Sequence, residues 1–99
     1  MIIKLVEIFE ISRHHSENIP FYSLREIFVN PEHVTCLRED EHTAKKLEAG
    51  LLPEQLDARQ RFTKVHLNRG FSGIDITVVG DPDSIKERLN KNTKTLLKG

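Results

Sequence analysis

The sequence predicts an α+β domain: an antiparallel sheet of about five strands, a short helical insertion at about residues 41–60 and a C-terminal helix. Two observations lead to this fold class. Apolar and polar residues alternate over residues 64–67 and again over residues 74–78, which is the period of a half-buried strand. The motif GDPDS at residues 80–84 then marks the start of a helix.

The two alternating segments form a predicted hairpin. Residues 68–73 connect them and include Gly70 and Gly73, which can adopt the positive φ angles that tight connections require. The length of this connection and the strands on either side indicate antiparallel pairing.

The C-terminal helix is predicted from its first turn. The Asp81 carboxylate can accept hydrogen bonds from free backbone N–H groups, and Pro82 suits the first helical position. Ile85 and Leu89 lie one turn apart and define the face that packs on the sheet. Residues 90–93 are indifferent helix formers, so we expect the helix to fray or kink near Asn90.

The N-terminal half supplies three more strands. Residues 2–11 carry apolar side chains on both faces, which predicts a strand covered by the core on one side and by a helix or second subunit on the other. Residues 12–20 form a loop, and residues 21–29 return as an antiparallel strand. After the Asn30-Pro31 turn, residues 33–39 form a third strand.

The third strand and the insertion after it have simple local patterns. Strict alternation places Val34 and Cys36 on one face, where we expect Cys36 to be a small core residue. Residues 40–50 have an acidic start and a closing glycine, which predicts a short helix. Residues 52–60 are expected to open a second helical turn.

Length and composition favour a single domain spanning residues 1–99. No apolar run reaches the roughly 20 residues that span a bilayer, and no signal-peptide pattern opens the sequence. One cysteine cannot form an intrachain disulfide. We therefore expect an intracellular protein with no membrane partner.

The net charge is zero but unevenly distributed. Residues 1–60 hold seven Lys/Arg against eleven Asp/Glu, and residues 61–99 hold eight against four. Solvated acidic and basic surfaces explain this pattern, and self-association or an anion site near the basic half is the alternative. The balance argues against a dedicated nucleic-acid binder.

The chemical motifs of an enzyme are missing from the sequence. The five histidines, of which His14 and His15 are adjacent, show no metal-ligand spacing. No base accompanies Cys36 in any recognisable motif, and the acidic run at residues 39–41 fits a helix start. We expect no catalytic residues, no metal and no cofactor.

One constellation has the ingredients of a ligand site. The connection at residues 70–73 presents Phe71 beside Arg69, and Arg61, Lys64 and His66 lie on the adjoining strand. One aromatic ring and several cations could stack on a base and hold its phosphates. We take Arg38, Arg61, His66, Arg69 and Phe71 as candidate ligand-binding residues. The alternative is plain hairpin geometry with a solvated cationic rim.

Three segments together resemble a known family. They are the strand EIFV with the turn NPEHV that follows it, the strand KVHL with its glycine-containing turn, and the second hairpin strand leading into SIKERL. This order, over residues 24–38 and 62–90, is similar to the FlbD-like small proteins of flagellar operons and their phage look-alikes. Residues 2–20 and 40–60 depart from that pattern.

The resemblance implies a small non-catalytic accessory protein, encoded by a phage or mobile element, and it supplies no functional residues. The first functional hypothesis is a non-enzymatic homo-oligomer that binds a host or phage protein through its insertion and a sheet edge. The alternative is a protein that binds and sequesters an anionic nucleotide messenger.

Overall fold

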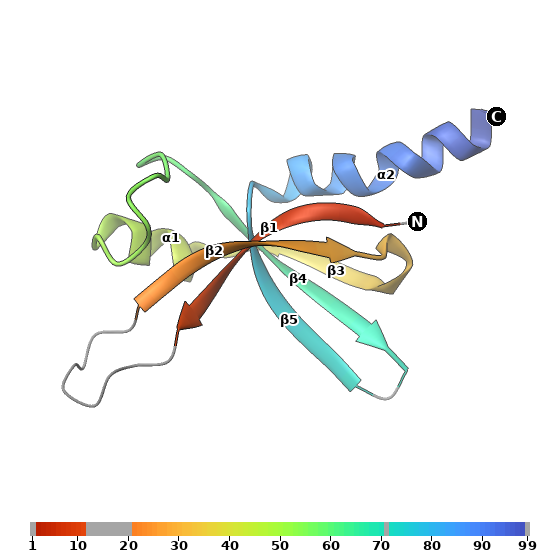
Figure 1. Ribbon diagram of the computed structural model, residues 1–99. Helices are drawn as coiled ribbons and strands as arrows, with labels where there is room; N and C mark the ends of the chain where they lie inside the picture. Colours follow the sequence, from red (N-terminus) through yellow and green to blue (C-terminus); the bar gives the residue numbers. More distant parts are fainter. Residues whose placement is uncertain (1, 12–20, 71, 99) are drawn as a thin grey trace.

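The computed structural model describes residues 2–11, 21–70 and 72–98, except for the side chains of residues 69, 72 and 92–98 (Figure 1). Five strands form one antiparallel sheet in the order β2-β1-β5-β4-β3. This confirms the predicted α+β fold with an internal and a C-terminal helix. The elements are β1 (Ile3–Ile11), β2 (Phe21–Val29), the 3-10 turn η1 (Pro31–His33), β3 (Val34–Glu39), α1 (Glu41–Glu48), β4 (Phe62–Arg69), β5 (Ser72–Val79) and α2 (Pro82–Lys98).

The connection between β2 and β3 forces the sheet to curl. These strands are the two edges of the sheet, yet only residues 30–33 separate them. Five flat strands about 4.8 Å apart would put their edges about 19 Å apart. Five residue steps span at most about 18 Å when fully extended, and η1 shortens that reach. The edges must therefore bend toward each other, and Figure 1 shows β2 running through this short connection into β3.

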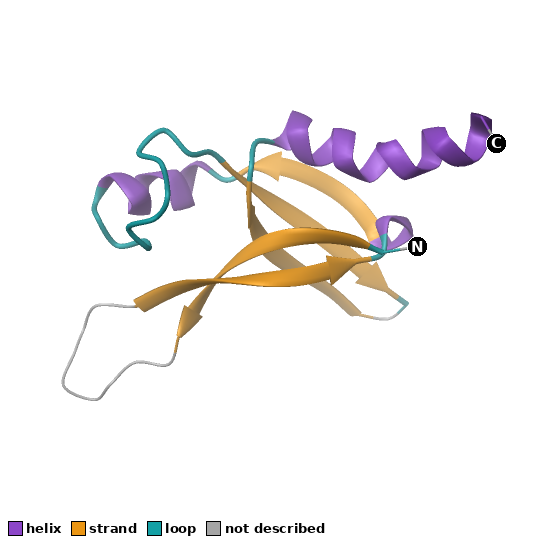
Figure 2. Ribbon diagram, turned by 45° about the horizontal axis from the view of Figure 1, so that its top comes forward, coloured by secondary structure: helices purple, strands orange, loops and turns teal. Residues whose placement is uncertain are grey.

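The inner face of this curled sheet holds the main core. Leu5, Val65 and Val78 are completely buried there. Ile85 and Leu89 of α2 pack onto them, as the helical spacing predicted. Figure 2 shows α2 lying along the sheet, with α1 at the opposite end of the molecule. Asp81 caps α2 by accepting from the backbone N–H and the hydroxyl of Ser84.

The outer face has a core of its own at one end only. Ile8 and Phe62 are buried there against Leu52, and partly buried side chains of α1 and β2 complete the cluster. Both apolar faces of β1 are therefore covered by parts of the same chain near Leu5 and Ile8, because Leu5 packs in one core and Ile8 in the other.

A buried carboxylate lies on the inner face near this end. Glu7 is 7% exposed, and its Oε1 accepts a hydrogen bond from Nε of Arg25 at 2.7 Å. The guanidinium of Arg25 also stacks over the ring of Phe9, 4.1 Å from the ring centroid. The cation therefore compensates a charge that would be costly to bury alone.

The insertion and α2 differ from the sequence prediction in extent. Residues 51–60 form turns in place of the predicted second helical segment. Gly50 adopts φ +76° and ends the helix, and Pro53 disfavours helical geometry at the residue before it. We expected α2 to fray or kink near Asn90, but the helix does not end there and continues to Lys98. Within the described ranges, no helix is long and apolar enough to cross a membrane.

A bulge in β3 reverses the predicted side-chain pattern. Val34 pairs with Leu67, but Cys36 pairs with His66, so the register shifts by one residue between them. The extra residue puts Val34 and Leu37 against the inner core. Cys36 consequently lies on the outer face and is exposed, so its prediction as a core residue is wrong.

Asp40 joins α1 to the sheet. Its side chain is the N-cap of α1 and accepts from the backbone N–H of Thr43 at 3.0 Å and from the Thr43 hydroxyl at 2.8 Å. The hydroxyl of Thr77 on β5 donates to the same carboxylate at 3.0 Å. Burial by itself raises the pKa of Asp40, but these hydrogen bonds outweigh it and hold the pKa below its ordinary value.

Asp40→Ala should destabilise the fold by about 1–3 kcal/mol, because it removes a helix cap and leaves buried donors unpaired. Urea denaturation of both proteins measures this difference. Glu54→Ala, at an exposed position between α1 and β4, is the control and should change the free energy of unfolding by less than about 0.5 kcal/mol. An equal effect of the two substitutions would contradict the role of Asp40.

The contribution of the Asp40 charge should depend on pH. Because its folded-state pKa is lowered, this stabilisation is fully present above the ordinary aspartate pKa of about 3.9 and is lost as the pH falls through the lowered value. The difference in unfolding free energy between the wild type and Asp40→Asn should therefore shrink between pH 6 and pH 2. A constant difference over that range would rule out a charge effect.

Candidate functional site

Three neighbouring strands place ionisable side chains together on the outer face. The strand register aligns Arg38, Lys64 and Thr77 in one row, and Cys36, His66 and Asp75 in the next. A cavity of about 250 Å³ opens between the two rows. We call it the outer-face pocket; its lining residues are Cys36, Arg38, Lys64, His66 and Asp75.

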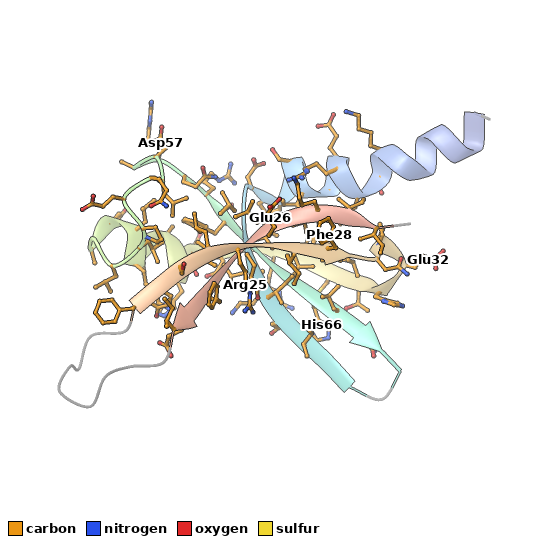
Figure 3. The ribbon with its side chains drawn as sticks, viewed as in Figure 1. Arg25, Glu26, Phe28, Glu32, Asp57 and His66 are labelled. Atoms are coloured by element: carbon orange, nitrogen blue, oxygen red, sulfur yellow. The ribbon has the colours of Figure 1, made fainter. Side chains whose placement is uncertain are left out.

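His66 is held in place by β5. Its Nδ1 lies 2.5 Å from Oδ1 of Asp75 (Figure 3 labels His66 on the β4–β5 hairpin). A Cβ atom added to Gly73 would lie 3.0 Å from both Cε1 and Nε2 of the imidazole. The ring can lie over β5 because residue 73 has no side chain.

The Asp75 carboxylate is ionised in this arrangement. The hydrogen bond from His66 is the largest influence and lowers the pKa of Asp75. Burial, the next largest, raises it, and the charges of His66, Lys64 and Arg38 lower it further. A carboxylate only accepts hydrogen bonds, so Nδ1 of His66 carries the proton between them.

Arg38 and Lys64 are less well compensated. They face each other directly across β3 and β4, and like charges in such a pair destabilise a sheet. Among the residues that the structure describes, neither forms an ion pair with a carboxylate. The Arg38 guanidinium makes a long hydrogen bond, 4.0 Å from its Nη2 to the sulfur of Cys36. The pocket thus contains two cations that could contact an anion.

The structure brings together two of the five predicted site residues, Arg38 and His66. Arg61 lies elsewhere: it forms a bidentate ion pair with Glu39, at 2.7 and 2.5 Å. This pairing lowers the pKa of Glu39 and raises that of Arg61. Arg61 is therefore not one of the residues that line the outer-face pocket. Phe71, the side chain of Arg69, and residues His14 and His15 lie outside the described parts.

Asp75 and Gly73 were not identified from the sequence, although the pairing of the two hairpin strands determines which residue lies opposite His66. The observed turn pairs Arg69 with Ser72, and the same register puts Asp75 opposite His66. A tight connection would have predicted that pair. The position of Arg38 in the same pocket as His66 could not be predicted in this way, because it depends on the bulge in β3.

The pocket does not contain a thiol–imidazole pair. Both ring nitrogens of His66 are directed to β5, one at Asp75 and the other over Gly73, whereas Cys36 is on β3. A thiol nucleophile requires a base within hydrogen-bond reach. Cys36 and His66 do not form such a pair in this arrangement.

A second surface stands out at the end of the sheet near η1. Ile2, Phe28 and Ile74 are 64%, 66% and 53% exposed and surround a depression of about 420 Å³. Figure 3 places Phe28 toward the same end as Glu32 of η1. We call this surface the apolar end; its lining residues are Ile2, Ile27, Phe28, Val29, Asn30, His33, Leu67 and Ile74.

Gly73→Ala should break the hydrogen bond between His66 and Asp75, because the new methyl group would contact the ring at 3.0 Å. The Asp75 pKa should then rise toward its ordinary value of about 3.9, which carboxyl-carbon NMR titration can measure. In a His66→Ala background, the same substitution should leave the Asp75 pKa unchanged. A shift of equal size in both backgrounds would show that the methyl group acts by another route.

No family model matches this chain, and no curated protein or solved structure is significantly similar to it. The resemblance to the FlbD-like family therefore stays a prediction. Function has to be inferred from the geometry of the outer-face pocket and the apolar end.

Proposed function

We propose that this protein is a non-enzymatic binding protein that works as a homo-oligomer. The observation that supports this proposal is the apolar end, where three large apolar side chains are each more than half exposed around one depression. Contiguous apolar surface of this kind marks interaction sites in proteins that are otherwise polar outside.

The free-energy scale fits association between copies. Burying one such side chain completely is worth about 1.5–3 kcal/mol, so the exposed parts of three offer roughly 3–6 kcal/mol. A two-fold interface buries the set twice, which is comparable with the roughly 4–15 kcal/mol that association costs. Further surface must therefore join the contact, and edge strand β2, which carries Phe28, is next to it.

A host or phage protein is the proposed partner of this oligomer, in the bacterial cytoplasm. Two features support a protein partner. Among the strands that the structure describes, β2 and β3 are the two edges and each has a neighbour on one side only. Edge strands are templates for pairing with another chain. The outward side of α1 presents exposed charges from Glu41, Lys45 and Glu48. A phage or mobile-element origin follows only from the FlbD-like resemblance.

A second candidate function is binding and sequestration of an anionic small molecule such as a nucleotide. A different observation favours it: Arg38 and Lys64 lie in one cavity with His66, and among the described residues neither forms an ion pair with a carboxylate. The two functions are compatible, because the outer-face pocket and the apolar end have no residue in common.

Phe28→Ser should lower the oligomeric state, because it removes the most exposed aromatic side chain of the apolar end. Native mass spectrometry and light scattering at micromolar concentration measure the mass of the wild type and the variant. The wild type should exceed the 11.4 kDa of one chain, and the variant should dissociate at a concentration at least about tenfold higher.

Phe21→Ser is the matched control, since Phe21 is a 46% exposed phenylalanine at the other end of β2. It should leave the mass unchanged. A monomeric wild type, or equal dissociation of both variants, would refute association through the apolar end. Circular dichroism of both variants confirms that each remains folded.

A further inference from the structure

We propose that the outer-face pocket binds a phosphate group of a small molecule, with Arg38 and Lys64 as the contacting cations. This inference rests on the second candidate function, anion binding, and adds the chemistry of the group that is recognised. It is carried by the position of two opposed cations beside the His66–Asp75 pair in one cavity.

The charge arrangement favours an anion with more than one negative charge. Arg38 and Lys64 are cross-strand neighbours, so their repulsion costs stability in the empty protein. A single dianionic group between them would relieve that repulsion and form charge-assisted hydrogen bonds to both. Arg38 offers a planar set of donors and Lys64 a compact point charge, which together suit the tetrahedral oxygens of a phosphate.

The Asp75 carboxylate offsets only part of the charge of these two cations, which help to lower its pKa. It accepts a hydrogen bond from Nδ1 of His66, and that bond is the main influence on its pKa. With Asp75 ionised, Arg38 and Lys64 leave an excess of one positive charge in the pocket. Gly73 keeps the ring over β5, on the far side of β4 from Arg38.

The size of the cavity limits what can enter it. Pockets that enclose drug-sized ligands have volumes of about 300–1,000 Å³. The outer-face pocket, at about 250 Å³, is smaller, so it would hold one charged group and leave the rest of a larger ligand outside. A sugar phosphate or the terminal phosphate of a nucleotide satisfies this limit.

Isothermal titration calorimetry of the full-length wild-type protein with ribose 5-phosphate, at low ionic strength, tests the proposal. Ribose and malonate serve as probes that lack the phosphate, and malonate retains two negative charges. We expect binding of ribose 5-phosphate, no binding of ribose, and weaker binding of malonate. Affinity should fall when salt is added, because screening weakens the contacts.

The site variant is Arg38→Gln with Lys64→Gln, which keeps much of each side-chain stem and removes both charges. Its affinity for ribose 5-phosphate should be at least about tenfold lower than that of the wild type. The matched control is Arg59→Gln with Lys45→Gln, which makes the same change in net charge at exposed positions away from the pocket. The control should bind like the wild type.

Thermal unfolding separates a binding role from a structural one. Because the site variant removes both a like-charge pair and the attraction of the two cations to Asp75, these effects oppose each other and its melting temperature should stay close to that of the wild type. Loss of affinity together with a lower melting temperature would indicate that the two cations support the fold, and would overturn the proposal.

Three binding results would also overturn it: no ribose 5-phosphate binding by the wild type, retained binding in the site variant, or equal loss in the control variant. If malonate bound as tightly as ribose 5-phosphate or more tightly, and the site variant lost that binding, the specificity for phosphate would be refuted. The broader anion-binding function would survive that result. The oligomer measurements on Phe28 are independent of all these outcomes.

Discussion

The short connection between the two sheet edges is the constraint on which the structure depends. Residues 30–33 tie β2 to β3 across three intervening strands, so the sheet has to curl. Curling creates an inner face that α2 can fill with Ile85 and Leu89. It also turns the outer faces of β3, β4 and β5 toward solvent, where the outer-face pocket lies. The apolar end is the place where the curled edges meet η1.

The parts of the fold that were predictable are those with local causes. The β4–β5 hairpin follows from alternation around a glycine-containing turn, and the start of α2 follows from the Asp81 cap. Non-local register was not predictable. The bulge between Val34 and Cys36 depends on pairing with β4, so a strictly alternating interpretation of β3 placed Cys36 in the core. The helical part of the insertion was overestimated because Gly50 ends α1. The apolar residues that follow, Leu52 and Leu56, lie in turns and pack into the outer-face core from there.

The candidate site was also predictable only in part, because its residues were recognisable but their pairing was not. Arg38 and His66 were identified as cations near a hairpin, but their meeting requires the register of three strands. Arg61 looked equivalent to them in the sequence. Its position one residue before β4 gives it Glu39 as a bidentate partner, and an ion pair of that geometry leaves little for a ligand. Residue type alone therefore did not separate a cation that pairs within the fold from cations that remain available.

Cys36 gives this molecule a practical property that none of its polar neighbours supplies. It is the single cysteine in the sequence, it is exposed, and it lines the outer-face pocket. A maleimide fluorophore or a nitroxide would therefore attach at one defined position on the wall of the cavity. Quenching or line broadening of such a label would report occupancy of the pocket directly, without assuming the identity of the compound that enters it.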